Sequence, residues 1–535
     1  MCYSAINLIP RKFSESEETG NGGTLENPFN GCRRCKAQAE SLRQKDRDAF
    51  GNVRMLLEGV ALVGTSFFIG GRKMFQDTLL KIAATINAYL SDYILIFMLI
   101  GIGLVFSIKT KFVQIRCFKE GIRRVFGNIK LFGTKDKNKM SSFQALATAV
   151  AAQVGTGNIV GASGAILTGG PGAIFWMWII AFLGMATIYA EATLAIKTRK
   201  VDKDGSIHGG PVYYITKAFK GGFGKFMAGF FAVALILALG FMGCMVQSNS
   251  IGSTMQTAFG IPSWIIGIIL VIICAFIFLG GVQRLASTTE KLVPVMACIF
   301  LLGGLVILIA RIKYVPATFG MIFKYAFQPQ AIIGGAFGYA IKTAISQGAK
   351  RGLFSNEAGM GSTPHAHALA DVKDPHDQGV CAMIGVFIDT FVVLTFNALV
   401  IICTLYTKDG ILASGAIPEG IGKANLAQTA FGTVMGDSFG SKFVAVCLLF
   451  FAFSTILSWN LFGKVNVQYL FGKKDPKRCT VIYTVIALVF IFLGTVASND
   501  LVWELTDLFN NIMVIPNALA LFVLSNEVKE IASKH

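Results

Sequence analysis

The stretch that decides the fold is GTGNIVGASGAILTGGPGAIFWMW, residues 155–178, which directly follows Gln153 and Val154. Its first seven residues place three glycines, Thr156 and Asn158 inside a run that is otherwise apolar. A helix that opens here exposes backbone N–H and C=O groups, which are too costly to leave in hydrocarbon and must face protein or a cavity. The N–H end suits a carboxylate and the C=O groups suit a cation, so the stretch predicts a site for a zwitterion and an ion.

The same glycines have a second interpretation that remains open. Gly157 and Gly161 stand in G-x-x-x-G spacing, which lets two membrane helices pack closely without any ligand. Both interpretations can hold at once.

The composition of the chain indicates a protein that crosses a membrane several times. Of its 535 residues 54 % are hydrophobic and 15 % are charged, and the apolar residues gather in runs about as long as a bilayer is thick. The net charge of +18 comes from basic residues in short loops, where they orient membrane helices, so we expect no nucleic-acid partner. Nothing in the sequence indicates an obligate protein partner.

Eleven candidate spans are centred near residues 99, 154, 184, 243, 272, 300, 341, 391, 452, 488 and 517. The connections between these spans alternate between the two sides of the membrane. One set holds 29 lysines plus arginines and the other holds 6, and the set with 29 is expected to be cytoplasmic. This places the C-terminus in the cytoplasm. We expect residues 1–73, which are polar, to be a disordered extension or to precede the true start at Met74.

Glycine is dense in two apolar regions, residues 155–172 and 334–361, which lie five spans apart. Such a pair is typical of inverted repeats whose broken helices frame a site at the bilayer midplane. We therefore expect an all-α integral membrane protein with a five-plus-five core and one extra amino-terminal helix. The predicted parts are listed in chain order: 74–140 (extra helix and basic loop), 141–325 (first repeat), 326–526 (second repeat) and 527–535 (cytoplasmic tail).

Several blocks, in order along the chain, resemble the alanine or glycine:cation symporter family, also called sodium:alanine symporters. They are residues 155–178, VQSNSI at 246–251, RGLFSNEAGMGSTPHA at 351–366, FAFSTILSW at 451–459 and NNIMVIPN at 510–517. The resemblance implies the inverted-repeat fold of sodium-coupled amino-acid transporters, with Na+ as the co-transported ion. The sequence contains no phosphate-binding loop that would indicate ATP as the energy source. It also contains no arrangement of catalytic residues that would indicate an enzyme.

The resemblance also implies a substrate site. Thr156, Gly157 and Asn158 would line it from the first broken helix, and Gln247 would reach it from the fourth span. Amide side chains bind an ammonium or a carboxylate without adding a charge. Trp459 would form an apolar wall that limits side-chain size. The alternatives are an interhelical hydrogen bond for Gln247 and ordinary packing for Trp459.

For the cation, we expect hydroxyl oxygens from Ser454 and Thr455 and backbone carbonyls near Val154 and Gly155, because hard cations take oxygen ligands. Thr455 would also border the substrate. The alternative is that both hydroxyls bond back to the preceding helical turn.

Asp389 and Glu191 are carboxylates at or near membrane depth, where an ionisable residue is a functional candidate. Ion coupling, proton binding and a structural pair all remain open for them. Together these features predict symport of a small neutral amino acid, alanine or glycine, with sodium across the bacterial plasma membrane by alternating access. A proton-coupled permease and a membrane sensor that does not transport are the alternatives.

Overall fold

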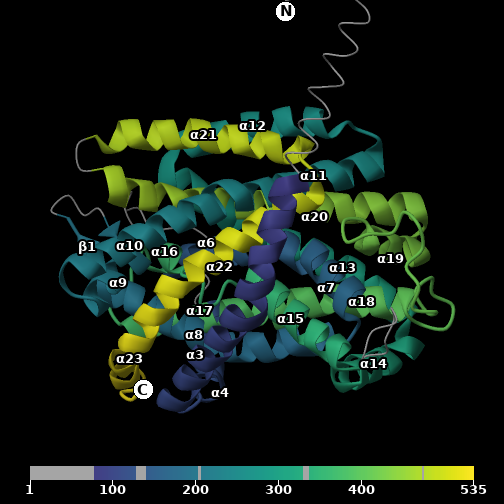
Figure 1. Cartoon of the computed structure of the whole chain (residues 1–535), viewed down its shortest axis with the longest axis horizontal. Coiled ribbons are helices and arrows are strands. Elements are labelled where there is room, and N and C mark those ends of the chain that lie inside the picture. The colour runs from purple at the N-terminus through teal and green to yellow at the C-terminus, as the bar shows by residue number, and fades with distance from the viewer. Residues whose placement is uncertain (1–76, 128–139, 203–206, 329–336, 473–474) are drawn as a thin grey trace, which may run out of the picture. The chain divides into compact units, whose positions relative to one another are not determined.

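The computed structural model describes residues 77–127, 140–202, 207–328, 337–472 and 475–535, and this part of the chain is almost entirely helical (Figure 1). The predicted extension 1–73, Met74 and the first residues of the second glycine-rich region lie outside the described residues. Residues 77–535 form one compact unit.

The elements of the first half, in order, are η1 (Leu90–Leu95), α3 (Ile96–Lys109), α4 (Val113–Arg116), α5 (Phe118–Gly127), α6 (Ser142–Gln153), η2 (Gly157–Gly161), α7 (Ala162–Gly169), α8 (Ala173–Thr198), β1 (Lys200–Val201), β2 (Ile207–His208), α9 (Pro211–Ala218), α10 (Gly221–Leu235), η3 (Ile236–Gly243), α11 (Cys244–Phe259), α12 (Ser263–Leu279) and α13 (Gly281–Ala310). Those of the second half are η4 (Ile312–Tyr314), α14 (Val315–Phe327), α15 (Phe337–Asn356), α16 (Pro364–His367), α17 (Pro375–Val386), η5 (Phe387–Leu394), α18 (Thr395–Leu405), α19 (Leu426–Met435), α20 (Asp437–Phe471), α21 (Pro476–Val496), α22 (Asn499–Val523) and α23 (Ser525–Ala532). The two short strands pair antiparallel, with Lys200 opposite His208.

Eight helices of the described residues are long and apolar enough to cross a membrane, and the bent pair Ser142–Gln153 and Gly157–Gly169 makes a ninth if it is counted as one span. The first begins at Asp77 and continues to Lys109. Two predicted spans do not meet these criteria of length and apolar character. The helix Ser263–Leu279 has 17 residues and is slightly short. The helix Phe337–Asn356 carries lysines and an arginine within its length.

The helices pack in two groups. In one group, α8 packs against α17, α15 and α3, while α15 packs against α7 and α17 packs against α6. In the other, α11 packs against α20 and α21, and α21 packs against α12. Figure 1 shows α21 and α12 side by side at one edge, with α3 and α22 crossing the face toward the viewer. The groups meet where α13 and α20 pack against α6, at the first break.

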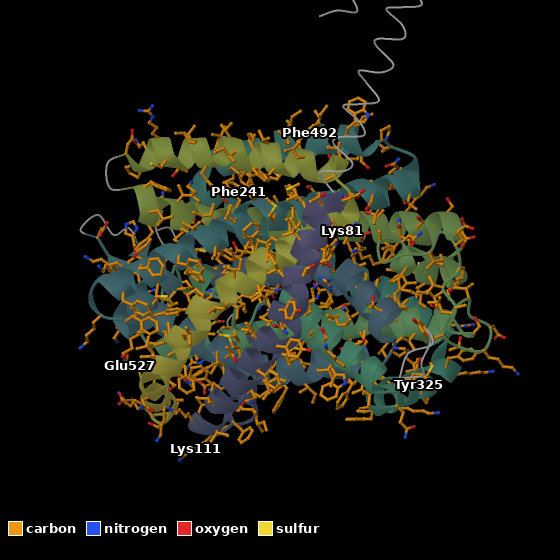
Figure 2. All side chains as sticks on the ribbon, in the orientation of Figure 1. Lys81, Lys111, Phe241, Tyr325, Phe492 and Glu527 are labelled. Atoms are coloured by element: carbon orange, nitrogen blue, oxygen red, sulfur yellow. The ribbon has the colours of Figure 1, made fainter. Side chains whose placement is uncertain are left out.

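The outer faces of α12 and α21 are apolar and exposed. Ile272, Phe276 and Val485 are 64 %, 66 % and 56 % exposed, respectively. Figure 2 shows carbon-rich side chains along this edge, near Phe492. In a soluble protein such a surface would be unfavourable, whereas lipid tails cover it at no cost.

The amino-terminal helix is fastened to α22 by amide side chains. Asn511 Nδ2 donates to Asn87 Oδ1 (3.0 Å) and to Ser91 Oγ (2.8 Å), and Asn87 Nδ2 donates to Glu504 Oε2 (2.8 Å). These hydrogen bonds join two segments more than 400 residues apart and fix the amino-terminal helix against the rest of the bundle.

The last helix, α23, is tied to the bundle by charge. Glu527 Oε2 lies 2.8 Å from Lys197 Nζ, at the end of α8, and 2.6 Å from Lys217 Nζ, at the end of α9. Burial alone would raise the pKa of Glu527, but hydrogen bonds and charges from the two lysines outweigh it and lower the pKa.

Candidate functional site

The first glycine-rich stretch is a helix broken at the predicted place. A capping box, formed by Ser141 and Gln144, starts α6, which ends at Gln153. Residues 154 and 155 are unwound, and the chain resumes in η2 and α7 at an angle of 41° to α6. The break leaves backbone N–H groups without helical partners in the interior of the protein.

Two predicted amide side chains satisfy those N–H groups. Gly155 N donates to Asn158 Oδ1 (3.0 Å), and Thr156 N donates to Gln247 Oε1 (3.1 Å). Asn158 and Gln247 are 0 % and 1 % exposed, so neither points toward lipid. The interhelical hydrogen bond considered for Gln247 therefore exists, and it ends on the unwound segment.

The helix α20 approaches the break so closely that a side chain at position 155 would not fit. A Cβ there would lie 2.4 Å from Thr455 Oγ1. Thr455 Oγ1 donates to Ala151 O (2.8 Å), and Ser454 Oγ reaches the same carbonyl at 3.4 Å. Both hydroxyls also bond back to Phe451 O, so the alternative interpretation of the pair holds as well. Both hydroxyls therefore contact the carbonyl of Ala151. This carbonyl lies one helical turn before those of residues 154 and 155, which were predicted to bind the cation.

The second glycine-rich region also contains a break, between α15 and α16. Glu357, Gly359 and Gly361 have φ values of 58°, 90° and 78°, which lie in the left-handed region. That conformation costs a residue with a side chain about 1–2 kcal/mol, so Glu357 must be held by its surroundings. Its carboxylate accepts hydrogen bonds from Trp459 Nε1 and from Ser362 Oγ.

Glu191, one of the two predicted carboxylates, binds this second break. Its two oxygens accept from Gly361 N (2.9 Å) and Gly359 N (3.0 Å). Asn517 Nδ2, from α22, donates both to Glu191 Oε1 (2.7 Å) and to Gly359 O (2.9 Å). Glu191 therefore holds the unwound backbone in place through charge-assisted hydrogen bonds.

Asp389, the other predicted carboxylate, joins the two breaks. Asn158 Nδ2 donates to its Oδ1 (2.6 Å), Ser355 Oγ reaches both carboxylate oxygens (3.1 and 3.0 Å), and Thr390 Oγ1 donates to its Oδ2 (2.8 Å). The broken helices also touch directly, since a Cβ on Gly157 would lie 2.9 Å from Ser355 Cα. The arrangement is a buried polar centre built from both breaks.

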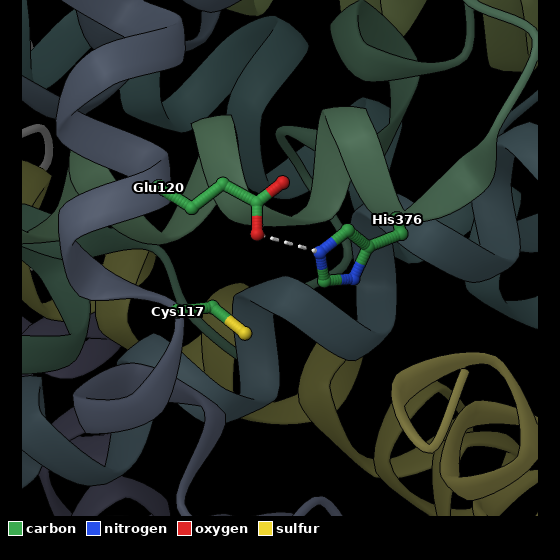
Figure 3. A group of neighbouring side chains, drawn as sticks. All are labelled: Cys117, Glu120 and His376. Carbon is green, nitrogen blue, oxygen red and sulfur yellow. Dashed lines mark hydrogen bonds and ion pairs between the residues drawn. The ribbon is translucent and has the colours of Figure 1, made fainter. Parts of the chain in front are cut away.

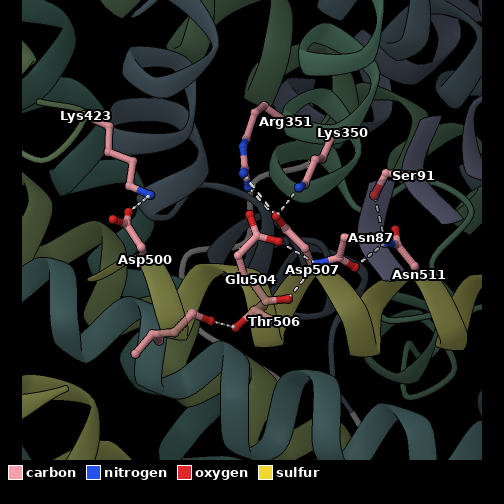
Figure 4. Close-up of polar contacts among 11 residues, drawn as sticks. Asn87, Ser91, Lys350, Arg351, Lys423, Asp500, Glu504, Thr506, Asp507 and Asn511 are labelled. Carbon is pink, nitrogen blue, oxygen red and sulfur yellow. Dashed lines mark hydrogen bonds and ion pairs between the residues drawn. The ribbon is translucent and has the colours of Figure 1, made fainter. Parts of the chain in front are cut away.

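A cluster of charged side chains lies between α15 and α22 (Figure 4). Arg351 makes two hydrogen bonds to Asp507 (3.1 and 3.0 Å), and Lys350 Nζ lies 2.8 Å from Asp507 Oδ2. The Arg351 guanidinium also lies 4.6 Å from the centre of the Trp503 ring. The richer set of connections in the charge count includes residues 350–373, and its placement of Lys350 and Arg351 is wrong because both lie in α15 and pair with a buried carboxylate. Without them the count is 27 against 6, so the asymmetry remains.

The structure brings most of the predicted residues together. Those that meet at the first break are Val154, Gly155, Thr156, Gly157, Asn158, Gln247, Ser454, Thr455 and, through Asn158, Asp389. Trp459 and Glu191 lie at the second break. Glu357, Ser355 and Asn397, which donates to Asn158 O (2.9 Å), were not singled out from the sequence. The sequence did indicate Glu357 as a candidate, because it is an ionisable residue in a glycine-rich membrane segment.

Comparison with known proteins agrees with this architecture. A sodium-coupled sialic acid symporter, solved in a substrate-bound outward-open state, superposes with a TM-score of 0.50 over 81 % of this chain and 86 % of its own, at 13 % identity. The likeness shows a shared fold.

Sequence comparison finds more similar relatives. The sodium/alanine symporter AgcS of Methanococcus maripaludis is 40 % identical over 445 residues, which cover 83 % of this chain and 94 % of AgcS. A Bacillus subtilis protein named probable sodium/glutamine symporter GlnT is 36 % identical over 85 % of this chain and 90 % of its own. The model of the sodium:alanine symporter family matches residues 76–535, and this chain belongs to that family.

Proposed function

We propose that this protein carries a small neutral amino acid, alanine or glycine, across the membrane together with sodium, by alternating access. The observation that supports it most is the buried centre at which two broken helices meet, lined by amides and hydroxyls, with Asp389 and Glu191 already bound by neutral donors. The similarity to the sodium/alanine symporter AgcS agrees with alanine as cargo.

In the proposed site, the substrate carboxylate lies at the unwound N–H groups near Thr156 and Gly157. It replaces the Gln247 oxygen at Thr156 N, which frees the amide of Gln247 to turn and donate a hydrogen bond to it. Asn158 keeps the segment open. Trp459, whose ring edge would lie 2.5 Å from a Cβ on Gly243, forms the wall that limits the side chain, with Thr455 beside it.

Sodium is proposed to bind where Ser454 and Thr455 face the end of α6. The hydroxyl oxygens of both residues, the carbonyl of Ala151 and the carbonyls of Val154 and Gly155 supply the oxygen ligands. When the ion binds, the hydroxyl protons turn away from Ala151 and the oxygens turn toward the ion.

The proposed membrane arrangement is that of two inverted repeats. Residues 141–325 and 326–526 are the repeats, 74–140 the extra helix and its loop, and 527–535 the cytoplasmic tail, with eleven spans in a bacterial plasma membrane. In this arrangement the two breaks would lie in corresponding places of the repeats, and one group of helices would rock against the other around them.

Uptake into proteoliposomes tests the proposal. We expect labelled alanine to accumulate when sodium is higher outside, and to stop accumulating when choline replaces sodium at the same pH. Uptake that persists in choline and follows a pH gradient would favour a proton-coupled permease that uses Asp389 or Glu191. Binding without accumulation would favour a sensor. Excess unlabelled alanine, glycine or glutamine, each added separately, identifies the cargo by competition with the labelled alanine. Glutamine is included because the relative GlnT is named for it.

A further inference from the structure

Three side chains with metal-binding atoms converge at a place remote from the candidate site. Cys117 lies between α4 and α5, Glu120 lies in the first turn of α5, and His376 lies in the first turn of α17. One ligand atom from each residue lies within 4.8 Å of the others. Figure 3 shows Glu120 and His376 facing each other, with the Cys117 thiol beside them.

The geometry of the chain places these atoms together. Gly121 N donates to Cys117 O (2.9 Å), so the chain from Cys117 to Gly121 makes a helical turn, and residues 117 and 120 lie on one face of it. His376 Nε2 points at Glu120 Oε2 from the opposing helix at 3.5 Å. Cys117 is 3 % exposed and the His376 side chain is fully buried, so bulk water competes little for these positions.

Neighbouring side chains orient two of the three ligands. The Tyr189 hydroxyl lies 2.7 Å from His376 Nδ1, and a phenol oxygen that accepts this proton leaves Nε2 with a free lone pair. Arg124 holds Glu120 Oε1 at 2.8 Å, which turns Oε2 toward the histidine. Partners of this kind, which fix the tautomer and orientation of a ligand, are usual around bound metals.

The surrounding charge also suits a cation. Besides Glu120, the carboxylates Asp377 and Asp374 face this junction, the first paired with Arg124 (2.8 Å) and the second with His535 (3.1 Å). The His535 ring stacks on His376 with 3.9 Å between ring centres. Positive charge is also present: Arg124 pairs with Glu120, and Arg116, next to Cys117, donates to the carbonyls of Thr110 and Ala532.

We propose that Cys117, Glu120 and His376 bind a divalent metal ion of the zinc class, with water as the fourth ligand. A thiolate, an imidazole and a carboxylate form a tetrahedral ligand set with one open position, and the thiolate selects against magnesium and calcium. The ion links α4 and α5 to α17, the helix that leads to Asp389.

The thiol must lose its proton when the metal binds. The thiolate is the form that binds a metal, so binding releases the thiol proton to solvent. Zinc affinity should therefore rise with pH.

The test uses the purified full chain, freed of metal with a chelator and then equilibrated with zinc. We expect about one tightly held zinc per chain, counted by mass spectrometry of the metal. Cys117→Ser and His376→Gln should lower the affinity by at least about a hundredfold, and Tyr189→Phe by about tenfold. Cys298→Ser, at an exposed thiol on α13, should bind zinc as the unmodified protein does.

Two further measurements distinguish lost binding from lost folding. Cobalt added to the unmodified protein should give a thiolate-to-cobalt charge-transfer band, and zinc, unlike magnesium, should raise its unfolding temperature. Cys117→Ser should show neither effect. Equal zinc binding by all variants, or no charge-transfer band in the unmodified protein, would overturn the proposal and leave an ordinary pair between Glu120 and His376.

Discussion

Replacing Gly155 with alanine tests whether the unwound segment must touch α20. The new Cβ would lie 2.4 Å from Thr455 Oγ1, where ordinary contacts begin at 3.4 Å, so the backbone or Thr455 must move by about 1 Å. Gln247 Oε1, at 3.2 Å, limits movement in another direction. Such overpacking costs about 1–3 kcal/mol.

The assay is the sodium dependence of alanine uptake in proteoliposomes. Because the displaced Thr455 hydroxyl is a proposed sodium ligand, Gly155→Ala should raise the half-saturating sodium concentration by about 5- to 150-fold. Gly164→Ala is the matched control on α7, since its Cβ would be 3.6 Å from the nearest atom of Lys423. That variant should stay within about twofold of the unmodified protein.

A double variant separates sodium binding from folding. Adding Thr455→Ala to Gly155→Ala removes the overlapping oxygen, so the unfolding temperature should recover while sodium dependence does not. If Gly155→Ala matches Gly164→Ala in its half-saturating sodium concentration, the close approach of residue 155 to α20 has no role in sodium binding and the reasoning is refuted.

Three other changes test the surrounding contacts. Arg351→Gln leaves Asp507 short of a buried partner and should destabilise the fold by about 3–5 kcal/mol in thermal unfolding, with Asp507→Asn restoring part of it; an unchanged unfolding temperature would contradict this. Trp459→Phe keeps an aromatic wall but removes the donor to Glu357, so the affinity for alanine should fall by about 1.5–3 kcal/mol in competition uptake, whereas equal affinity would place the tryptophan outside the site. The lowered pKa of Glu527 means that its contribution to stability is present above the unfolded-state value of about 4.3 and is lost as pH falls through the folded-state value. Glu527→Gln should abolish that part of the acid destabilisation, and unfolding curves that fall in parallel with pH for both proteins would show that the two lysine pairs contribute nothing.

The first break could be predicted because its signal is local. Three glycines and two polar residues within seven positions of an apolar run already indicate where a helix opens. The inward direction of Asn158 and Gln247 follows from the cost of polar groups in lipid. For the second break the same signal was present, yet Glu357 was overlooked among the glycines.

The partners of the carboxylates could not be predicted. Asp389 binds Asn158, 231 positions away, and Ser355, 34 positions away. A single sequence indicates which residues face the interior, but the pairing depends on how helices distant in the chain cross. For the same reason the sequence alone placed Lys350 and Arg351 in a connection, because their partner Asp507 is distant in the chain.

Asn158 joins the two breaks mechanically. Its Oδ1 accepts from Gly155 N within the first break, while its Nδ2 donates to Asp389, which also accepts from Ser355 at the end of α15. A change in the opening of either helix therefore alters hydrogen bonds at the other. If the amino acid and sodium bind at these breaks, each must change the affinity of the other by the same factor, because the coupling free energy belongs to the pair. The chain Gly155–Asn158–Asp389–Ser355 is the route we propose for that coupling.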